Sequence, residues 1–197
     1  LHSMGRAGKD DLHLKNAPLS EILREAAEPH IERGKMVNSA IIGDLDPADQ
    51  PKIYRHPEII HGLRNMIQNA VDFANTAIWV DYSWDNENII IRISDDGQGY
   101  PEHMLNRIGD PFVRSRKQGF DRNQRPGYKG MGLGLFIAKT LLERTGASLK
   151  FANGSNADIS CSKSNERSGA IVQIIWERAQ IEHVAQELGP NVMMDQY

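Results

Sequence analysis

The chain has 197 residues and a mass of 22.1 kDa, which is enough for one domain with a well-buried core. Hydrophobic residues make up 40% and charged residues 25%, a composition that excludes a disordered or fibrous chain. Lys and Arg number 23 against 26 Asp and Glu, so the net charge of -3 does not indicate a nucleic-acid-binding protein.

Cysteine content and hydropathy indicate the compartment. The single cysteine, Cys161, excludes an intramolecular disulfide framework and indicates a reducing environment. Apolar stretches such as residues 170–176 are far shorter than a bilayer span. We therefore expect these residues to be cytoplasmic. Because the first residue is Leu, we expect a piece of a longer protein, with residues 1–3 left from cloning and residues 1–18 an arm from a preceding domain.

The first half of the chain predicts two helices and three strands. Apolar residues recur at helical spacing over residues 19–31 and 57–75. A short strand is expected between them, over residues 36–42. Apolar residues then alternate over residues 76–84 and 88–94, which predicts a β-hairpin.

The second half begins with residues 100–129, which lack sustained periodicity, and a loop this long in a compact domain is usually functional. A helix is predicted over residues 132–144, closed by Gly146, with strands over 149–152 and 170–177. Residues 181–188 are expected to form a terminal helix. We expect an α/β two-layer sandwich in which helices cover one face of a mixed β-sheet, with residues 19–177 as the domain and 178–197 as a tail.

The second predicted helix carries a polar ladder opposite its apolar stripe. Each of its members has another member three or four residues away: His61, Asn65, Gln68, Asn69 and Asp72. A solvated face is the ordinary interpretation of such a row. Solvated faces are usually built from Lys, Glu and Arg, because Asn and Asp cost up to about 0.7 kcal/mol each relative to Ala. The density of short amides therefore favours a ligand site.

Two glycine-rich motifs flank the long loop. In the first, the strand over residues 88–94 runs into Asp95, Gly97 and Gly99, where an aspartate could accept a hydrogen bond from an exocyclic amine. An ordinary turn between strands is the alternative. In the second, alternate glycines at 130, 132 and 134 open a helix, whose unpaired N–H groups form a cradle for phosphate. Close packing of helix on sheet is the alternative there.

The loop between the two motifs is locally basic. Residues 100–129 hold seven Lys and Arg side chains and three acidic ones, although the whole chain is acidic. A basic lid beside a phosphate cradle suits a polyphosphate ligand.

The order of these features resembles the ATP-binding catalytic domain of sensor histidine kinases, within the group that includes gyrase, Hsp90 and MutL. Residues 65–70 match the N box, 95–99 the first glycine box, 110–114 the F box and 130–135 the second glycine box. The resemblance spans residues 19–177 and implies a Bergerat-type ATP-binding fold. Residues 61–74 and 130–144 are most similar to the RegB/PrrB/ActS redox-responsive kinases of proteobacteria.

The resemblance implies a role for each matching residue. Asn69 would bind Mg²⁺, Asn65 would support the phosphates during transfer, and Asp95 would accept the adenine amine. Arg114 would reach a terminal phosphate and act in catalysis. Asp72 stands where the family often has a phosphate-contacting lysine, and we expect it to bind water or metal. The nucleotide would also be contacted by Phe73, Gly97, Gly99, Tyr100, Ile108, Phe112, Lys129, Gly130, Met131, Gly132, Leu133, Gly134 and Leu135.

Asn65 distinguishes a kinase from an ATPase. ATP-hydrolysing relatives have a glutamate at this position that activates water, and an amide cannot act as a general base. The resemblance therefore implies transfer of the γ-phosphoryl group to a histidine outside this chain. His13 has the His-to-Pro spacing of an acceptor box, but the prolines between it and residue 65 leave no room for the required helical hairpin.

The partners implied are ATP, the histidine-bearing dimerisation domain of the same protein and the receiver domain of a response regulator, with no nucleic acid. The whole protein is expected to be a homodimer anchored in the inner membrane, and this piece alone a monomer. Two alternatives stay open, a nucleotide-gated clamp of the Hsp90, MutL or gyrase type and a serine kinase of the anti-sigma type.

Overall fold

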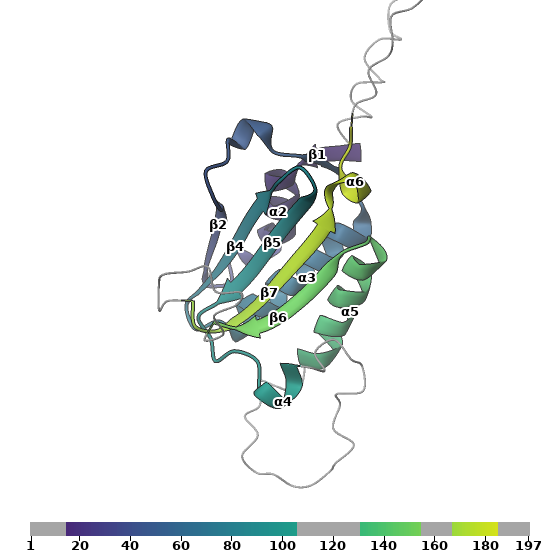
Figure 1. Cartoon of the computed structure of the whole chain (residues 1–197). Helices are drawn as coiled ribbons and strands as arrows, with labels where there is room; N and C mark the ends of the chain where they lie inside the picture. The colour runs from purple at the N-terminus through teal and green to yellow at the C-terminus, as the bar shows by residue number, and fades with distance from the viewer. Residues whose placement is uncertain (1–14, 106–130, 155–166, 185–197) are drawn as a thin grey trace, which may run out of the picture.

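A five-stranded mixed β-sheet forms one layer of the molecule and helices form the other (Figure 1). The computed structural model describes residues 15–105, 131–154 and 167–184. The strand order is β2-β4-β5-β7-β6. Strand β2 (Met36–Ile41) runs parallel to β4 (Ala77–Trp84), whereas β5 (Asn88–Asp95), β7 (Ala170–Glu177) and β6 (Ser148–Asn153) pair antiparallel along the rest of the sheet. The predicted α/β sandwich with a mixed sheet is confirmed.

The helices cover one face of the sheet, and the core lies between the layers. Helices α2 (Leu19–Ala27) and α3 (Pro57–Phe73) lie behind the sheet in Figure 1, and α5 (Met131–Arg144) is seen to the right of β6. The apolar stripe of α3, including Ile59, Leu63 and Ile67, is fully buried. Alternate residues of the hairpin strands are buried against it, because successive side chains of a strand point to opposite faces.

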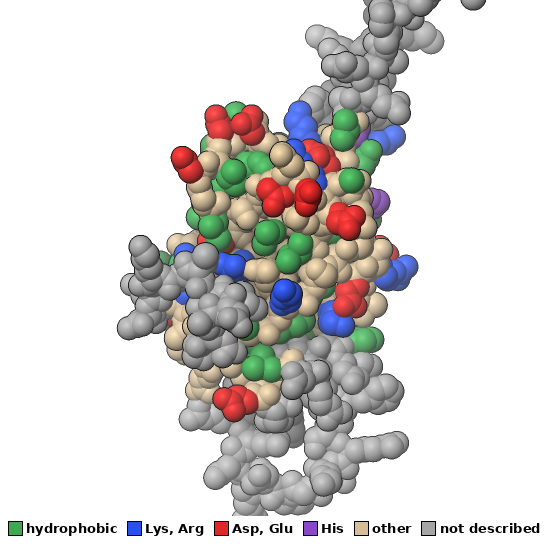
Figure 2. All heavy atoms as spheres, in the orientation of Figure 1, with side chains coloured by type: hydrophobic (Ala, Val, Ile, Leu, Met, Phe, Trp, Pro, Cys, Tyr) green, Lys and Arg blue, Asp and Glu red, His purple; other side chains and the backbone are tan. Residues whose placement is uncertain are grey.

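The other face of the sheet is turned away from the helices. Figure 2 shows this face, on which hydrophobic, basic and acidic side chains are interspersed. None of the helices in the described ranges combines the length and apolar content needed to span a membrane.

Most predicted elements agree with the structure to within one or two residues. The predicted helix over residues 19–31 ends earlier, because Pro29 cannot continue an α-helix and a 3₁₀ turn, η1 (Glu28–His30), follows α2. The predicted terminal helix over residues 181–188 is wrong at 182–184, which are not helical; the rest of it lies outside the described residues. A helical turn, α6 (Arg178–Ile181), precedes them.

Four short elements have no clear signal in the sequence. Strand β1 (Asn16–Pro18) pairs antiparallel with β3 (Lys52–Tyr54), so residues that the sequence assigns to an arm lie in a two-stranded sheet. A 3₁₀ turn, η2 (Pro47–Asp49), precedes β3, and α4 (Glu102–Leu105) begins the segment expected to be a loop. Runs of three or four residues are too short to display a period.

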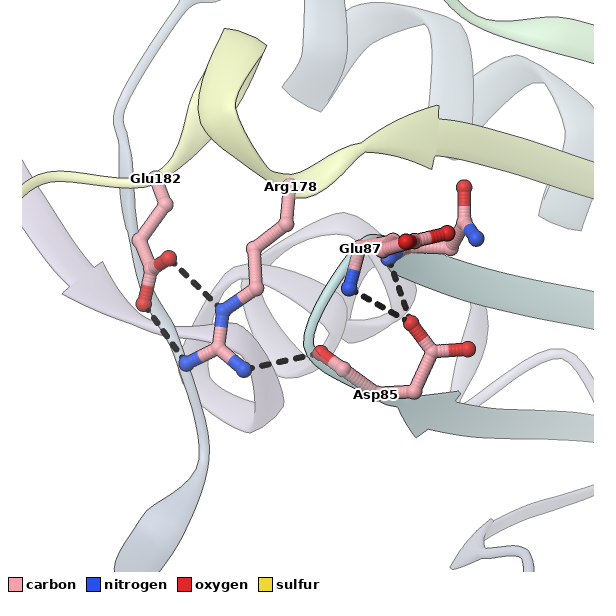
Figure 3. Close-up of polar contacts among 5 residues, drawn as sticks. Asp85, Glu87, Arg178 and Glu182 are labelled. Carbon is pink, nitrogen blue, oxygen red and sulfur yellow. Dashed lines mark hydrogen bonds and ion pairs between the residues drawn. The ribbon is translucent and has the colours of Figure 1, made fainter.

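Arg178 ties the hairpin turn to the C-terminal end of the fold (Figure 3). Its Nε and Nη2 atoms donate to the two carboxylate oxygens of Glu182 at 2.7 and 2.8 Å. Its Nη1 donates to the carbonyl of Asp85 at 2.9 Å, and its backbone N–H donates to the carbonyl of Glu87 at 2.6 Å. The Asp85 carboxylate closes the turn by accepting from the backbone N–H groups of Glu87 and Asn88, which lower the pKa of Asp85.

Replacing Arg178 with Met is expected to lower the free energy of unfolding by about 1–3 kcal/mol, because the substitution removes charged hydrogen bonds in a half-buried setting. Urea unfolding of the chain measures this change. The control is Arg144→Met, whose ion pair with Glu58 is more exposed and is worth about 0.5 kcal/mol or less. Equal losses for the two variants would contradict the assigned role of Arg178.

Candidate functional site

A buried carboxylate, Asp95, ends strand β5 and is only 2% exposed. Its Oδ1 accepts hydrogen bonds from the backbone N–H groups of Gly97 at 2.8 Å and Ala170 at 3.1 Å. Its own carbonyl accepts from the N–H of Gly169 at 3.0 Å. Within the described part of the chain, no hydrogen bond engages Oδ2. Two segments that are far from each other in the sequence therefore hold Oδ1 of the carboxylate, and Oδ2 is left for a further donor.

The surroundings of Asp95 favour its protonated form. Burial raises the pKa of Asp95 to about 6, against the lowering effect of the hydrogen bonds from Gly97 and Ala170. The charge of Asp96 raises it further, and that of Lys35 lowers it. Perturbed carboxylates of this kind are concentrated at functional sites, because burying an acid without a task costs stability.

Two glycines let the backbone approach the carboxylate. A Cβ atom at Gly97 would lie 2.2 Å from the carbonyl oxygen of Phe73, and one at Gly169 would lie 2.0 Å from Oδ1 of Asp95. No side chain fits at either position. The first glycine motif is thus more than a turn between strands, because it is packed against the end of α3. Gly169, directly before β7, joins the site although it lies outside the predicted motif.

Asp96 locks the end of α3 to the end of β5. Its Oδ1 accepts from the backbone N–H groups of Asn75 at 2.7 Å and Thr76 at 3.0 Å, and Oδ2 accepts from the Thr76 hydroxyl. Although burial raises the pKa of Asp96, hydrogen bonds from Thr76 and the neighbouring backbone outweigh that effect and lower it. This lock sets the position of α3 relative to Asp95.

Tyr100 and Asn153 anchor the chain after the glycine motif. The Asn153 amide accepts from the N–H of Tyr100 at 2.6 Å and donates to its carbonyl at 2.7 Å. Tyr100 is 5% exposed, and burial together with the nearby charge of Asp95 raises the pKa of its hydroxyl. Gly99 adopts a φ of 77° next to this contact. The sequence alone does not predict the role of Asn153. The only signal is that this polar residue is the last of strand β6.

The polar ladder of α3 divides into two groups. Asn65 and Asn69 are half-buried, whereas His61 and Gln68 are exposed. Within the described residues, no hydrogen bond occupies the amide of Asn65 or Asn69. The exposed Asp72 carboxylate has a protein partner, since Arg33 Nη2 lies 2.7 Å from its Oδ1. Two amides are therefore positioned to bind an external ligand.

The donor set suits magnesium better than a metal that needs several protein ligands. No group of three His, Cys, Asp or Glu side chains in the described ranges could hold a metal ion. Magnesium binds through one or two protein oxygens together with water and substrate phosphates. A half-buried asparagine amide on a rigid helix fits that pattern.

Helix α5 begins with the second glycine motif, and this beginning lies toward the C-terminal end of α3. The two helices run antiparallel, because Glu58 and then Gly62 along α3 contact Arg144 and then Leu142, in reverse order along α5. The N-terminus of α5 therefore lies toward Asn69. Among the residues that the structure describes, Cβ atoms at Gly132 and Gly134 would meet no atom within 4 Å, so packing against those residues does not explain the two glycines. Leu133 is exposed and Leu135 buried.

Part of the predicted site lies outside the described residues. This part comprises Ile108, Phe112, Arg114, Lys129, Gly130 and the side chain of Met131. Of the site residues that the structure describes, Phe73 at the end of α3, Asp95, Gly97 and Tyr100 lie close together. Asn65 and Asn69 lie further back along α3, and Gly132, Leu133, Gly134 and Leu135 are in the first turn and a half of α5.

The sequence of the chain is similar to those of known histidine kinases. Residues 55–180 match the family model described as histidine kinase-, DNA gyrase B-, and HSP90-like ATPase. The sensor histidine kinase RegB of Cereibacter sphaeroides is 55% identical over 98% of this chain, which spans 42% of the length of that protein. The sensor histidine kinase CpxA of Escherichia coli K12 is 30% identical over 64% of this chain and 25% of its own length.

Solved structures share the fold at low sequence identity. The catalytic domain of histidine kinase ThkA superposes with a TM-score of 0.59 at 16% identity, covering 82% of this chain and 95% of that one. The mycobacterial sensor histidine kinase MprB superposes with a TM-score of 0.58 at 16% identity, covering 83% of this chain and 96% of its own.

The pKa of Asp95 predicts how stability depends on pH. The folded-state pKa of about 6 exceeds the ordinary value, so the folded protein binds the extra proton between about pH 4 and 6. The contribution of Asp95 to stability is therefore present below that window and is lost as pH rises through it. The stability of Asp95→Asn relative to the wild type is expected to increase from pH 4 to pH 7, as measured by urea unfolding at stepped pH.

Asp96→Asn is the matched control for this experiment. The pKa of Asp96 is lowered, so its contribution is present above the ordinary pKa and is lost as pH falls. The stability of Asp96→Asn relative to the wild type is thus expected to fall as pH rises to about 4, and to stay nearly level across the window in which Asp95 titrates, so the pH series extends down to about pH 3. A pH-independent difference between Asp95→Asn and the wild type would exclude a raised pKa at Asp95.

Proposed function

We propose that this chain, which belongs to the histidine kinase-, DNA gyrase B-, and HSP90-like ATPase family, is the ATP-binding catalytic domain that supplies the γ-phosphoryl group in a sensor histidine kinase. The observation that carries the proposal is the Asp95 carboxylate, held at Oδ1 by two backbone N–H groups beside the end of α3, where Gly97 packs on the Phe73 carbonyl. A site built in this way can read a purine on one side and a metal-bound phosphate chain on the other.

Asp95 would read the base. Its Oδ2 would accept a hydrogen bond from the exocyclic amine of adenine, while Oδ1 stays bound to Gly97 and Ala170. A buried acceptor of this kind discriminates strongly against a base without the amine, because the carboxylate would then be left without its donor. Phe73 and Tyr100 would enclose the base from the neighbouring elements.

The phosphates would lie between α3 and the start of α5. Asn69 would hold Mg²⁺ through its amide oxygen, and the ion would neutralise charge on the phosphate oxygens. Asn65 would steady the phosphate chain, and the N–H groups around Gly132 and Gly134 would face it. From the long loop, Arg114 and Lys129 would supply positive charge, and Ile108 and Phe112 would cover the nucleotide.

The γ-phosphoryl group would pass to a histidine rather than to water. Asn65, one helical turn before Asn69, cannot take a proton from water, so hydrolysis lacks its general base. Catalysis would then consist of positioning and charge neutralisation. The acceptor histidine would belong to a dimerisation domain outside this chain, and a response regulator would receive the phosphoryl group next.

The chain spans under half the length of RegB, so the activity and partners of the whole protein are proposed here by similarity. By similarity to that sensor kinase, we propose a membrane-anchored homodimer that responds to redox state. Residues 19–177 would form the catalytic domain, supplemented by β1 and α6, with residue 181 in the core. Residues 1–18 would otherwise lead from the dimerisation domain.

Calorimetry with a non-hydrolysable ATP analogue tests the site. Asp95→Asn is expected to weaken binding at least about tenfold, because a charged hydrogen bond to the base is lost. Asn69→Ala is expected to abolish the magnesium dependence of binding. Gln68→Ala, on the exposed side of the same helix, is the control and should bind like the wild type. Wild-type affinity in all three variants would refute the proposed site.

Incubation with γ-labelled ATP tests the reaction. The chain alone is expected to remain unlabelled, and a separate polypeptide carrying the acceptor helix is expected to become labelled on histidine. Asn69→Ala should reduce that labelling by at least about a hundredfold, because positioning and charge neutralisation carry the catalysis. Rapid ATP hydrolysis without an acceptor would favour the clamp-type ATPase, and labelling on serine would favour the anti-sigma type.

A further inference from the structure

Arg167 lies on the face of the sheet opposite to the helices. Its Nη1 forms an ion pair with Oδ2 of Asp81, and its guanidinium carbon lies 5.0 Å from the ring centroid of Trp79. Trp79 and Asp81 are on the outer face of β4, because they alternate with the buried residues that face α3. The Asp81 side chain is 3% exposed and that of Arg167 is 24% exposed.

Stability alone is a weak explanation for this cluster. A buried ion pair costs much of its attraction in desolvation, and apolar replacements of similar volume are often as stable. Arg92 is the residue directly opposite Asp81 on β5, yet its guanidinium donates to Gln173 at 2.8 Å. The partner of Asp81 instead comes from the segment immediately before β7.

That segment is the one that grips Asp95. Gly169 and Ala170, two and three residues after Arg167, donate to the carbonyl and to Oδ1 of Asp95. The segment is packed tightly on its other side, since a Cβ atom at Gly154 would lie 2.2 Å from the carbonyl oxygen of Arg167. Gly154 also donates to the carbonyl of Gly169 at 2.8 Å. A shift of Arg167 is therefore transmitted to the N–H of Ala170.

We propose that Arg167, held by Asp81 and Trp79, is a positioning residue that sets the orientation of the Asp95 carboxylate and so the preference of the site for adenine. The proposal rests on the proposed function, in which Asp95 reads the adenine amine. Arg167 itself touches neither the base nor the phosphates. It acts from the opposite face of the sheet through the backbone of residues 168–170.

The test compares the affinities of the chain for ATP and for inosine triphosphate, which has a carbonyl in place of the amine. Arg167→Met is expected to weaken ATP binding about tenfold, the size of one charged hydrogen bond, and to leave inosine triphosphate binding unchanged. Asp81→Asn should show the same selective loss, and the double variant no further loss. Arg167→Lys retains the charge beside Asp81 and should recover part of the preference.

Arg178→Met is the control, because it removes a comparable ion pair at a site remote from Asp95 and should leave the ratio of the two affinities unchanged. If Arg167→Met weakens the binding of both nucleotides equally, or changes the binding of neither, the positioning role is overturned. If Arg167→Met does not fold, Trp79→Leu removes the ring contact alone and should reduce the preference in the same direction; an unchanged ratio in that variant would also overturn the role. A wild-type chain that binds both nucleotides equally would refute the reading of adenine itself.

Discussion

The arrangement of the site depends on one buried carboxylate, which accepts hydrogen bonds from backbone N–H groups of two segments that are far from each other in the sequence. Asp95 is bonded by Gly97, two residues later, and by Ala170 at the start of β7. This grip requires β5 and β7 to be neighbours and requires glycine at 97 and 169, where a side chain would collide with the carbonyl of Phe73 or with Asp95. Two effects on Asp95 oppose each other, since burial stabilises the neutral acid and the hydrogen bonds from the N–H groups stabilise the anion. The result is a group with a pKa of about 6, able to change state when a donor arrives.

The elements around Asp95 are tied to it rather than merely packed nearby. Asp96 joins the end of α3 to the end of β5, and α5 runs antiparallel to α3, so its glycine-rich start lies toward the same end of the domain. A rigid helix thereby presents the two asparagine amides at a set position relative to the carboxylate. Preorganisation of this kind suits phosphoryl transfer, in which the protein contributes position and charge and undergoes little covalent chemistry of its own.

Long periodic segments and residue-type patterns are the features that the sequence could predict. The helix over residues 57–75, the hairpin and the order of the glycine motifs show strong periods or unusual composition, and all are present in the structure. Contacts between residues distant in sequence leave no such trace. The bond from Ala170 to Asp95 and the clasp of Asn153 on Tyr100 depend on strand order and register, which a local pattern does not encode. The pairing of Asp72 with Arg33 arises in the same way, since a helix period shows a residue's face but not its partner.

The most direct measurement follows the carboxyl carbon of Asp95 by NMR as a function of pH, with and without a non-hydrolysable ATP analogue. We predict a pKa near 6 for Asp95 in the free chain. Binding of the nucleotide should lower that pKa, because a donor to Oδ2 stabilises the ionised form. A pKa at the ordinary aspartate value in the free chain, or one unchanged by the bound nucleotide, would contradict the central role given to this residue.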